Sequence, residues 1–340
     1  YGYCMADQHP PPYPLTFTPA LRDYIWGGRN LETLYGRNLP PGRTAESWEI
    51  SGHPTAPTAV DAGPLAGQTL PDLLAAYGAD LVGTRAGWAL ERGKFPLLIK
   101  LLDPEKRLSV QVHPPDDYAL IHENGELGKT EMWYVLHARP GAQLILGLRP
   151  SVTPEVFRQA IADNSLEACL HHLPVKAGDA VFVPSGTLHA ILEGVLIAEI
   201  QQNSDTTYRV YDWGRLGADG RPRALHVDKA MAVTDFRRVE PGTYQPVLVA
   251  SEEGVARYEI TRSDYFVVER VTLPAGMAYA GRTEGETLEI WGTVDGESDL
   301  TWAGGAVSLP TVRFCLVPAR LGNFAVRALQ PTTMLRVYLP

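Results

Sequence analysis

Four side chains of metal-binding type are spaced so that strands could bring them together. Side chains alternate between the two faces of a strand, so Gln111 and His113 of the phrase SVQVH point to the same side. Glu131 begins the strand-like run EMWYVL, and His189 follows the turn PSGT. Two imidazole nitrogens, a carboxylate and an amide oxygen suit Zn(II) and also accept Fe(II), Co(II) or Mn(II). Because the set contains no cysteine, it favours a catalytic site over a structural zinc site.

Each of these residues also has an ordinary structural explanation. A single histidine in a β protein more often makes hydrogen bonds than binds a metal ion. We interpret five other histidines in this way: His9, His122, His137, His171 and His172. A buried glutamine such as Gln111 usually satisfies backbone groups. The metal-site hypothesis therefore depends on the joint pattern.

Short strands dominate the rest of the sequence and must position these residues. Runs such as EMWYVLH, QLILGL, DAVFVP and GVLIAEIQQ are closed by Gly, Pro or Asp, which is typical of an antiparallel sandwich or barrel. Helical signals are few. The phrase LPDLLAAYG has one apolar face before Gly78, and TPEVFRQAIADN begins with Thr153 as a cap and Pro154 in the first turn. The sequence predicts a mainly β protein with a few short helices.

Composition and charge limit the class of protein. The 340 residues are 45% hydrophobic and 20% charged, as in an ordinary globular protein, and are enough for two domains. The net charge of -9 disfavours nucleic acid as a partner, since a phosphate-binding surface normally has a basic surplus. No apolar stretch is long enough to cross a bilayer, and no close cysteine pair occurs among Cys4, Cys169 and Cys315. We therefore expect a cytoplasmic protein without a membrane partner.

A domain boundary is expected near the phrase VEPGTYQP, after the helix-like segment HVDKAMAVTDF. A new series of short strands begins there, continues to the C-terminus and contains no histidine. We expect two domains, residues 6–240 with the metal site and residues 241–340 as a second, metal-free β domain.

The joint pattern resembles the cupin superfamily. The phrase G-x5-P-x-G-x2-H is met by Gly178, Pro184, Gly186 and His189. The earlier cupin phrase is met in modified form, with Gln111 where a histidine is common, by Gln111, His113, Glu131 and Gly141. This resemblance implies a double-stranded β-helix, the jelly-roll barrel of cupins, for the first domain.

A closer resemblance is to class I mannose-6-phosphate isomerases of the short bacterial type. The matching phrases include ESWEISGHP, FPLLIKLLDPEKRLSVQVHP, GKTEMWYVL, GDAVFVPSGTLHAI, EIQQNSDTTYRVYDWGR and LHVDKA, within about residues 20 to 235. The resemblance implies interconversion of D-mannose 6-phosphate and D-fructose 6-phosphate through an enediol, and a degenerate cupin-like C-terminal domain. It also implies a catalytic arginine, Arg209, and one Zn(II) per chain held by Gln111, His113, Glu131 and His189.

Three further residues are candidates for binding substrate or moving protons. Lys129 lies two residues before Glu131, and Lys100 ends the run FPLLIK. Ser109 lies two residues before Gln111 on the same strand face. Ammonium and hydroxyl groups bind a phosphodianion, and a buried lysine can act as a base, so Lys129 is also a candidate for catalysis. These residues also have ordinary explanations: the two lysines could be exposed to solvent, and Ser109 could form a hydrogen bond with the backbone.

The phrase ESWEISGHP adds Trp48 and His53 as candidates that line the substrate pocket. Core packing of Trp48 and a loop position for His53 explain the phrase equally well. Arg209 suits enediolate or phosphate oxygens, and its ordinary explanation is a surface salt bridge.

Two other functions fit a metal-binding cupin. An Fe(II)-dependent oxygenase would leave ligand positions open for oxygen, although Gln111, Arg209 and the long matching phrases weigh against it. A non-catalytic cupin that holds a metal ion and binds sugar would also explain the degenerate C-terminal domain. The sequence decides neither the native metal nor the oligomeric state.

Overall fold

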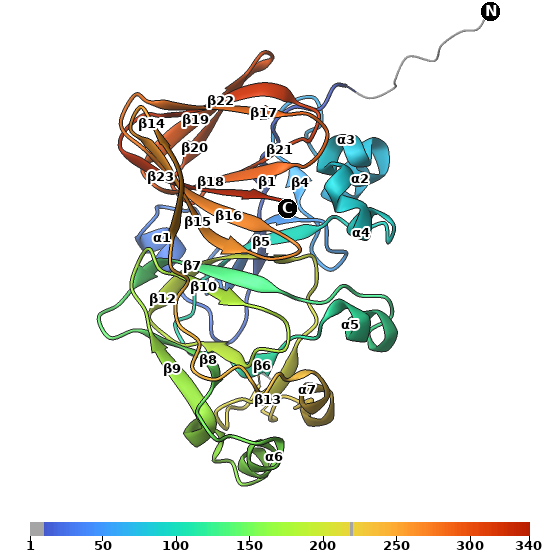
Figure 1. Cartoon of the computed structure of the whole chain (residues 1–340), viewed down its shortest axis with the longest axis vertical. Helices are drawn as coiled ribbons and strands as arrows, with labels where there is room; N and C mark the ends of the chain where they lie inside the picture. The colour runs from blue at the N-terminus through green and yellow to red at the C-terminus, as the bar shows by residue number, and fades with distance from the viewer. Residues whose placement is uncertain (1–9, 218–219) are drawn as a thin grey trace, which may run out of the picture. The chain divides into compact units, whose positions relative to one another are not determined.

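The computed structural model describes residues 10–217 and 220–340 (Figure 1). Cys4, His9 and the start of the expected domain 6–240 lie outside the described residues. The chain divides into two compact units. The metal-site unit consists of Leu21–Trp48 and Leu98–Gln245. The C-terminal unit consists of Glu49–Leu97, Pro246–Pro340 and the described part of Tyr1–Ala20.

This division differs in one respect from the expected domains. The expected boundary at residue 240 lies near the change of unit at Pro246, but Glu49–Leu97 groups with the C-terminal strands and not with the metal-site residues. The division into the domains 6–240 and 241–340 stays a prediction.

Two sheets hold Gln111, Glu131 and His189, and His113 directly follows a strand of the second sheet. The six-stranded sheet has the order β10-β7-β12-β5-β3-β2, and the five-stranded sheet has the order β13-β6-β11-β8-β9. The first consists of β2 Ala20–Arg22, β3 Glu46–Ser51, β5 Leu97–Leu102, β7 Glu131–Ala138, β10 Ala180–Val183 and β12 Val195–Gln202. The second consists of β6 Val110–Val112, β8 Gln143–Leu148, β9 Leu170–Pro174, β11 His189–Ile191 and β13 Tyr208–Tyr211.

Three further sheets contain the remaining strands. A six-stranded sheet has the order β14-β15-β16-β23-β18-β21, with bounds β14 Val247–Glu252, β15 Val255–Arg262, β16 Val267–Leu273, β18 Glu289–Asp295, β21 Phe314–Val317 and β23 Thr332–Tyr338. A four-stranded sheet has the order β17-β22-β19-β20, with bounds β17 Ala278–Thr283, β19 Glu297–Trp302, β20 Gly305–Pro310 and β22 Gly322–Ala328. The pair β1 Phe17–Thr18 and β4 Ala59–Val60 completes the set.

The mainly β class is therefore confirmed. Within residues 10–217 and 220–340 the strands pair in separate sheets and not in one closed ring of hydrogen bonds. A jelly roll is built from two such sheets. The expected cupin barrel corresponds to the two sheets that contain the metal-site residues.

Helices are few and short, as expected. They are α1 Asn30–Thr33, α2 Leu70–Tyr77, α3 Ala79–Val82, α4 Gly87–Leu90, α5 Asp116–His122, α6 Pro154–Ala162 and α7 Val227–Val233, with 3-10 turns at Thr84–Ala86 and Leu166–Cys169. Both predicted helices are confirmed. Thr69 and Asp72 form a capping box on α2, and the Thr153 hydroxyl accepts from the Val156 amide on α6. No helix among the described residues has the length and apolar character needed to span a membrane.

Strand register sets the positions of the candidate residues. In β6, Val110 and Val112 are buried in an apolar cluster, so Gln111 between them faces the opposite side. Gln111 is the direct partner of His189 on β11 and of Arg209 on β13. Directly opposite residues of an antiparallel pair share a face, so these three side chains lie in one row across the five-stranded sheet.

Candidate metal centre and active site

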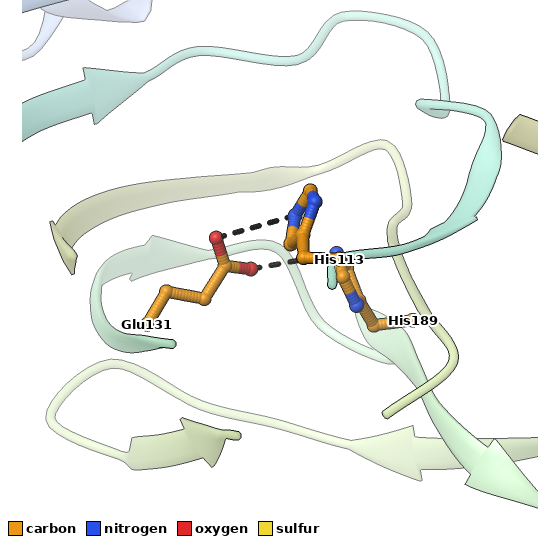
Figure 2. A group of neighbouring side chains, drawn as sticks. All are labelled: His113, Glu131 and His189. Carbon is orange, nitrogen blue, oxygen red and sulfur yellow. Dashed lines mark ion pairs between the residues drawn. The ribbon is translucent and has the colours of Figure 1, made fainter. Parts of the chain in front are cut away.

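His113, Glu131 and His189 converge on one point (Figure 2). One ligand atom from each lies within 4.8 Å of the others, and each residue is only 1% exposed. Glu131 Oε2 lies 3.5 Å from His113 Nε2, and Glu131 Oε1 lies 3.4 Å from His189 Nε2. The carboxylate therefore points both of its oxygens at the two imidazole rings.

Hydrogen bonds fix which nitrogen of each ring faces the carboxylate. Nδ1 of His113 lies 2.8 Å from the carbonyl oxygen of Thr206, and Nδ1 of His189 lies 2.8 Å from that of Thr187. A carbonyl only accepts, so Nδ1 of each ring is the protonated donor and Nε2 presents its lone pair. Burial lowers the pKa of His189 to about 4 and lowers the pKa of His113 well below its ordinary value. Both rings are uncharged at neutral pH, although they lie at ion-pair distance from Glu131.

The converging atoms are therefore all hydrogen-bond acceptors. Among the described residues, His113 Nε2 and Glu131 Oε1 are buried without a hydrogen-bond donor, and Glu131 Oε2 has only the Lys129 ammonium, 2.9 Å away. Such an arrangement is unfavourable by itself and fits a cation placed between the three groups. The Gln111 amide lies beside them, with Nε2 at 3.5 Å from His189 Nε2. Because the two ends of an amide are interchangeable by a half turn, its oxygen can face the same cation.

Lys129 joins the metal group to a second buried carboxylate. Its Nζ lies 2.9 Å from Glu131 Oε2 and 3.7 Å from Glu199 Oε1. Burial alone would lower the pKa of Lys129, but the charges of Glu131 and Glu199 outweigh burial and raise it. Lys129 is therefore a buried ammonium and not the solvated lysine of the ordinary explanation.

Lys100 is enclosed by carboxylates in the same way. Its Nζ lies 3.6 Å from Glu46 Oε2, 3.6 Å from Asp205 Oδ1 and 3.9 Å from Glu199 Oε1. Burial alone would lower the pKa of Lys100, but these three carboxylates raise it above its ordinary value. The ammonium also lies 4.3 Å from the ring centre of Trp48, whose indole N–H donates to Glu46 at 2.6 Å. Trp48 thus contacts the Lys100 ammonium and also binds Glu46, one of the carboxylates beside Lys100.

A cavity of about 230 Å³ brings half of the predicted residues together. The predicted residues in its wall are Lys100, Ser109, Gln111, Lys129 and Arg209. His53 belongs to the C-terminal unit, where it is buried with Nδ1 2.8 Å from Thr55 Oγ1. Its role as a pocket residue stays a prediction.

Arg209 reaches the cavity wall from β13. Its Nε donates to Ser109 Oγ at 3.1 Å, and its Nη1 donates to the carbonyl oxygen of Ala224 at 3.1 Å. Ser109 in turn donates to Gln111 Oε1 at 3.4 Å. The pKa of Arg209 is lowered by burial and by the charge of Arg223. Arg209 is therefore held by uncharged groups next to the metal-site residues and is not a surface salt bridge.

Comparison with known proteins assigns this chain to a family. Residues 15–142 match the model "Phosphomannose isomerase type I, catalytic domain". The chain is 37% identical over 314 residues to "Probable mannose-6-phosphate isomerase GmuF" of Bacillus subtilis, which is 92% of this chain and 96% of the relative. The mannose-6-phosphate isomerase of Streptococcus mutans is 42% identical over 255 residues, 75% of this chain and 77% of the relative. The chain belongs to the type I phosphomannose isomerase family.

Solved structures agree with this assignment. The mannose 6-phosphate isomerase from Bacillus subtilis matches with a TM-score of 0.85 at 34% identity, over 96% of this chain and 99% of that chain. A phosphomannose isomerase from Salmonella typhimurium matches with a TM-score of 0.76 at 17% identity, which shows the shared fold. As a member of this family, the protein is an aldose–ketose isomerase.

The sequence prediction missed several charged residues of this cavity: Glu46, Glu199, Asp205 and Arg223. Glu199 is the most informative. It is the register partner of Trp133, two residues from Glu131 along β7, and its Oε2 accepts from the Trp133 indole at 3.0 Å. Burial and then the charge of Glu131 raise its pKa, and Oε1 has no hydrogen-bond donor within the described residues. A single carboxylate inside the apolar run VLIAEI was a signal that could have identified it.

Proposed function

We propose that the protein is a zinc-dependent isomerase that interconverts D-mannose 6-phosphate and D-fructose 6-phosphate through an enediol. The observation that carries this proposal is the buried group of His113, Glu131 and His189, whose acceptor atoms face one another beside a charged cavity. Family membership supports the same reaction, because relatives carry the name mannose-6-phosphate isomerase. The donor set of two imidazoles, a carboxylate and the Gln111 amide suits Zn(II).

The reaction moves one proton between neighbouring carbons. The proton on C2 of the open-chain aldose leaves, the electrons form the C1–C2 double bond, and the C1 oxygen gains a proton to give the enediol. The C2 oxygen then loses its proton and becomes the carbonyl oxygen, and a proton returns to C1. A Zn(II) held by Gln111, His113, Glu131 and His189 would polarise the C1 or C2 oxygen and stabilise its negative charge. The chain itself must bind the sugar, transfer the proton and exclude water.

Glu199 and Lys129 are suited to the proton transfer. A base that works near neutral pH needs a pKa between that of an ordinary carboxylate and that of an ordinary amine. Burial raises the pKa of Glu199 toward this range, and its Oε1 accepts no hydrogen bond from the described residues, whereas the raised pKa of Lys129 keeps Lys129 protonated. We assign the proton-accepting atom to Glu199 Oε1 and give Lys129 the role of a charged donor beside it.

Arg209 and Ser109 bind the substrate in this proposal. Both line the cavity, and Arg209 carries a permanent charge suited to phosphate or enediolate oxygens. Lys100, held between three carboxylates, maintains the charge balance of the wall.

The first experiment is metal removal and restoration. Purified protein is treated with a chelator and given one equivalent of Zn(II), and conversion of fructose 6-phosphate to mannose 6-phosphate is followed by a coupled assay. His113→Ala is measured in parallel, with His122→Ala as control because His122 is exposed at the end of α5. We expect restored turnover in the wild type and His122→Ala and none in His113→Ala. Zinc binding without turnover of either sugar phosphate would refute the assignment, and oxygen uptake with Fe(II) would replace it with an oxygenase.

A further inference from the structure

The lysines of the cavity are poor candidates for holding a phosphate. Lys100 lies within 4 Å of Glu46, Glu199 and Asp205, and Lys129 lies 2.9 Å from Glu131. Their positive charges are already matched, and a phosphodianion would add negative charge beside several carboxylates. The phosphate of a sugar substrate therefore needs another part of the cavity wall.

Arginines gather around one carboxylate, Asp212, which is only 7% exposed. Arg223 donates through Nε to Asp212 Oδ2 at 2.7 Å and through Nη2 to Oδ1 at 2.6 Å. Arg215 donates to Oδ1 at 2.5 Å. Burial lowers the pKa of Arg209, and the nearby positive charge of Arg223 lowers it further. Three guanidinium groups around one carboxylate give this cluster a positive surplus.

Two of these three arginines face the cavity. Arg209 and Arg223 belong to its wall, whereas Arg215 turns to the carbonyl oxygen of Arg107. The two bonds from Arg223 to Asp212 use two of the five N–H donors of a guanidinium. The same bonds hold the group in a fixed orientation, which reduces the entropy lost when a ligand binds.

We infer that Arg223 binds the phosphate of the substrate together with Arg209. This inference rests on the proposed function, and it gives the substrate a direction in the cavity. Arg209 is connected through Ser109 to Gln111, so the phosphate lies at the arginine end and the reacting carbons lie toward His113 and Glu131. Arg223 then makes the site selective for phosphorylated over free hexoses.

The test compares two arginines that share Asp212. Arg223→Gln removes a guanidinium that faces the cavity, and Arg215→Gln removes one that does not. Steady-state kinetics of the zinc-loaded full chain are measured with mannose 6-phosphate, together with competitive inhibition by inorganic phosphate. Loss of a charge-assisted hydrogen bond predicts a rise in KM of about 10- to 100-fold in Arg223→Gln, with a smaller change in kcat. The inhibition constant of phosphate rises in parallel, and Arg215→Gln stays near wild type.

A measurement without turnover separates this inference from the proposed function. Inorganic phosphate raises the Tm of a protein that binds it, and we expect this shift in the wild type and Arg215→Gln but not in Arg223→Gln. If the wild type turned over neither sugar phosphate, the proposed function would fail and the Tm shifts would still decide the inference. An unchanged KM in Arg223→Gln, or an equal rise in both variants, would overturn it.

Discussion

The two units contain a similar arrangement of a glutamate, a tryptophan and a cation. In the metal-site unit, the Trp48 indole donates to Glu46 at 2.6 Å, and Lys100 Nζ lies 4.3 Å from the Trp48 ring centre. In the C-terminal unit, the Trp291 indole donates to Glu289 at 2.8 Å. Arg336 takes the place of the lysine there, 5.9 Å from the Trp291 ring centre. Each glutamate lies two residues before its tryptophan on a strand of a six-stranded sheet.

The difference between the arrangements lies in how the charges are matched. Arg336 donates through Nε to Glu289 at 2.9 Å and through Nη1 to Glu269 at 3.2 Å. One planar guanidinium thus satisfies two buried carboxylates. The lysine of the metal-site unit is a point charge, and neighbouring buried acceptors such as Glu199 Oε1 have no hydrogen-bond donor within the described residues.

This comparison separates a structural charge cluster from a reactive one. Matched charges hold strands together and leave little capacity for a ligand, whereas acceptors without donors persist only where a bound group compensates them. The absence of histidine from residues 246–340 agrees with this division. We therefore propose that the cluster around Arg336 serves stability and that the cluster around Lys100 and Glu199 serves chemistry.

The largest difference is expected between equivalent glutamate substitutions in the two regions. Glu131→Gln removes the carboxylate charge between the two imidazoles, and we expect loss of the bound metal and a fall in kcat/KM of at least about 1000-fold. Glu289→Gln should keep both at wild-type values below its own Tm. Metal content per chain and the coupled assay measure the two outcomes. A Glu131→Gln protein that kept its metal and its rate would remove the distinction between the clusters.

The second prediction contrasts a loss of stability in the C-terminal unit with a loss of activity in the metal-site unit. Arg336→Met leaves Glu289 buried without its cation and Glu269 with Arg257 alone, so the free energy of unfolding should fall by about 3–5 kcal/mol while kcat/KM of the folded protein is unchanged. Lys100→Met should lower kcat/KM by about 100-fold, because Lys100 lines the cavity. Urea unfolding and steady-state kinetics on both variants check this. A drop in kcat/KM in Arg336→Met would show that the C-terminal cluster is not purely structural.

The third prediction concerns pH and follows from the buried histidines of the metal-site unit. In the metal-free protein, burial lowers the pKa of His189 from 6.5 to about 4. The unfolded chain then binds more protons than the folded chain between these values, so the free energy of unfolding falls as the pH drops from about 6.5 to about 4. The contribution of His189 is about 3 kcal/mol. Chemical unfolding of the metal-free protein and of His189→Asn at both pH values measures it, and an equal slope in the two proteins would contradict the assignment.

Much of this site followed from the sequence because strand geometry is regular. The alternation in SVQVH correctly places Gln111 opposite the buried Val110 and Val112, and the helix caps at Thr69 and Thr153 are local signals. The phrase matches were sufficient to bring His113, Glu131 and His189 together, and the structure shows them within 4.8 Å. These features depend on residues close in sequence or on a known pattern.

The missed features depend on pairing across the sheets. Glu199 acquires its raised pKa from burial and from Glu131 on the neighbouring strand, which no local pattern reveals. Arg223 reaches the cavity from a segment outside the named strands and is held there by Asp212. The grouping of Glu49–Leu97 with the C-terminal strands likewise arises from long-range packing. Sequence reasoning identified the ligand types, whereas the charge balance required the three-dimensional arrangement.

The smallest effect sharpens the comparison most, because the two changes are chemically identical. Trp48→Phe and Trp291→Phe each remove an indole N–H that donates to a glutamate, the partly buried Glu46 or the buried Glu289, at a cost of about 1–2 kcal/mol in the free energy of unfolding. Trp48→Phe also weakens the support of Lys100, so kcat/KM should fall by about 10-fold, whereas Trp291→Phe should leave it unchanged. Thermal unfolding and the coupled assay measure the pair. Similar losses of stability with activity lost in Trp48→Phe alone would show that one arrangement serves catalysis and the other serves packing, and activity lost in both would refute that division.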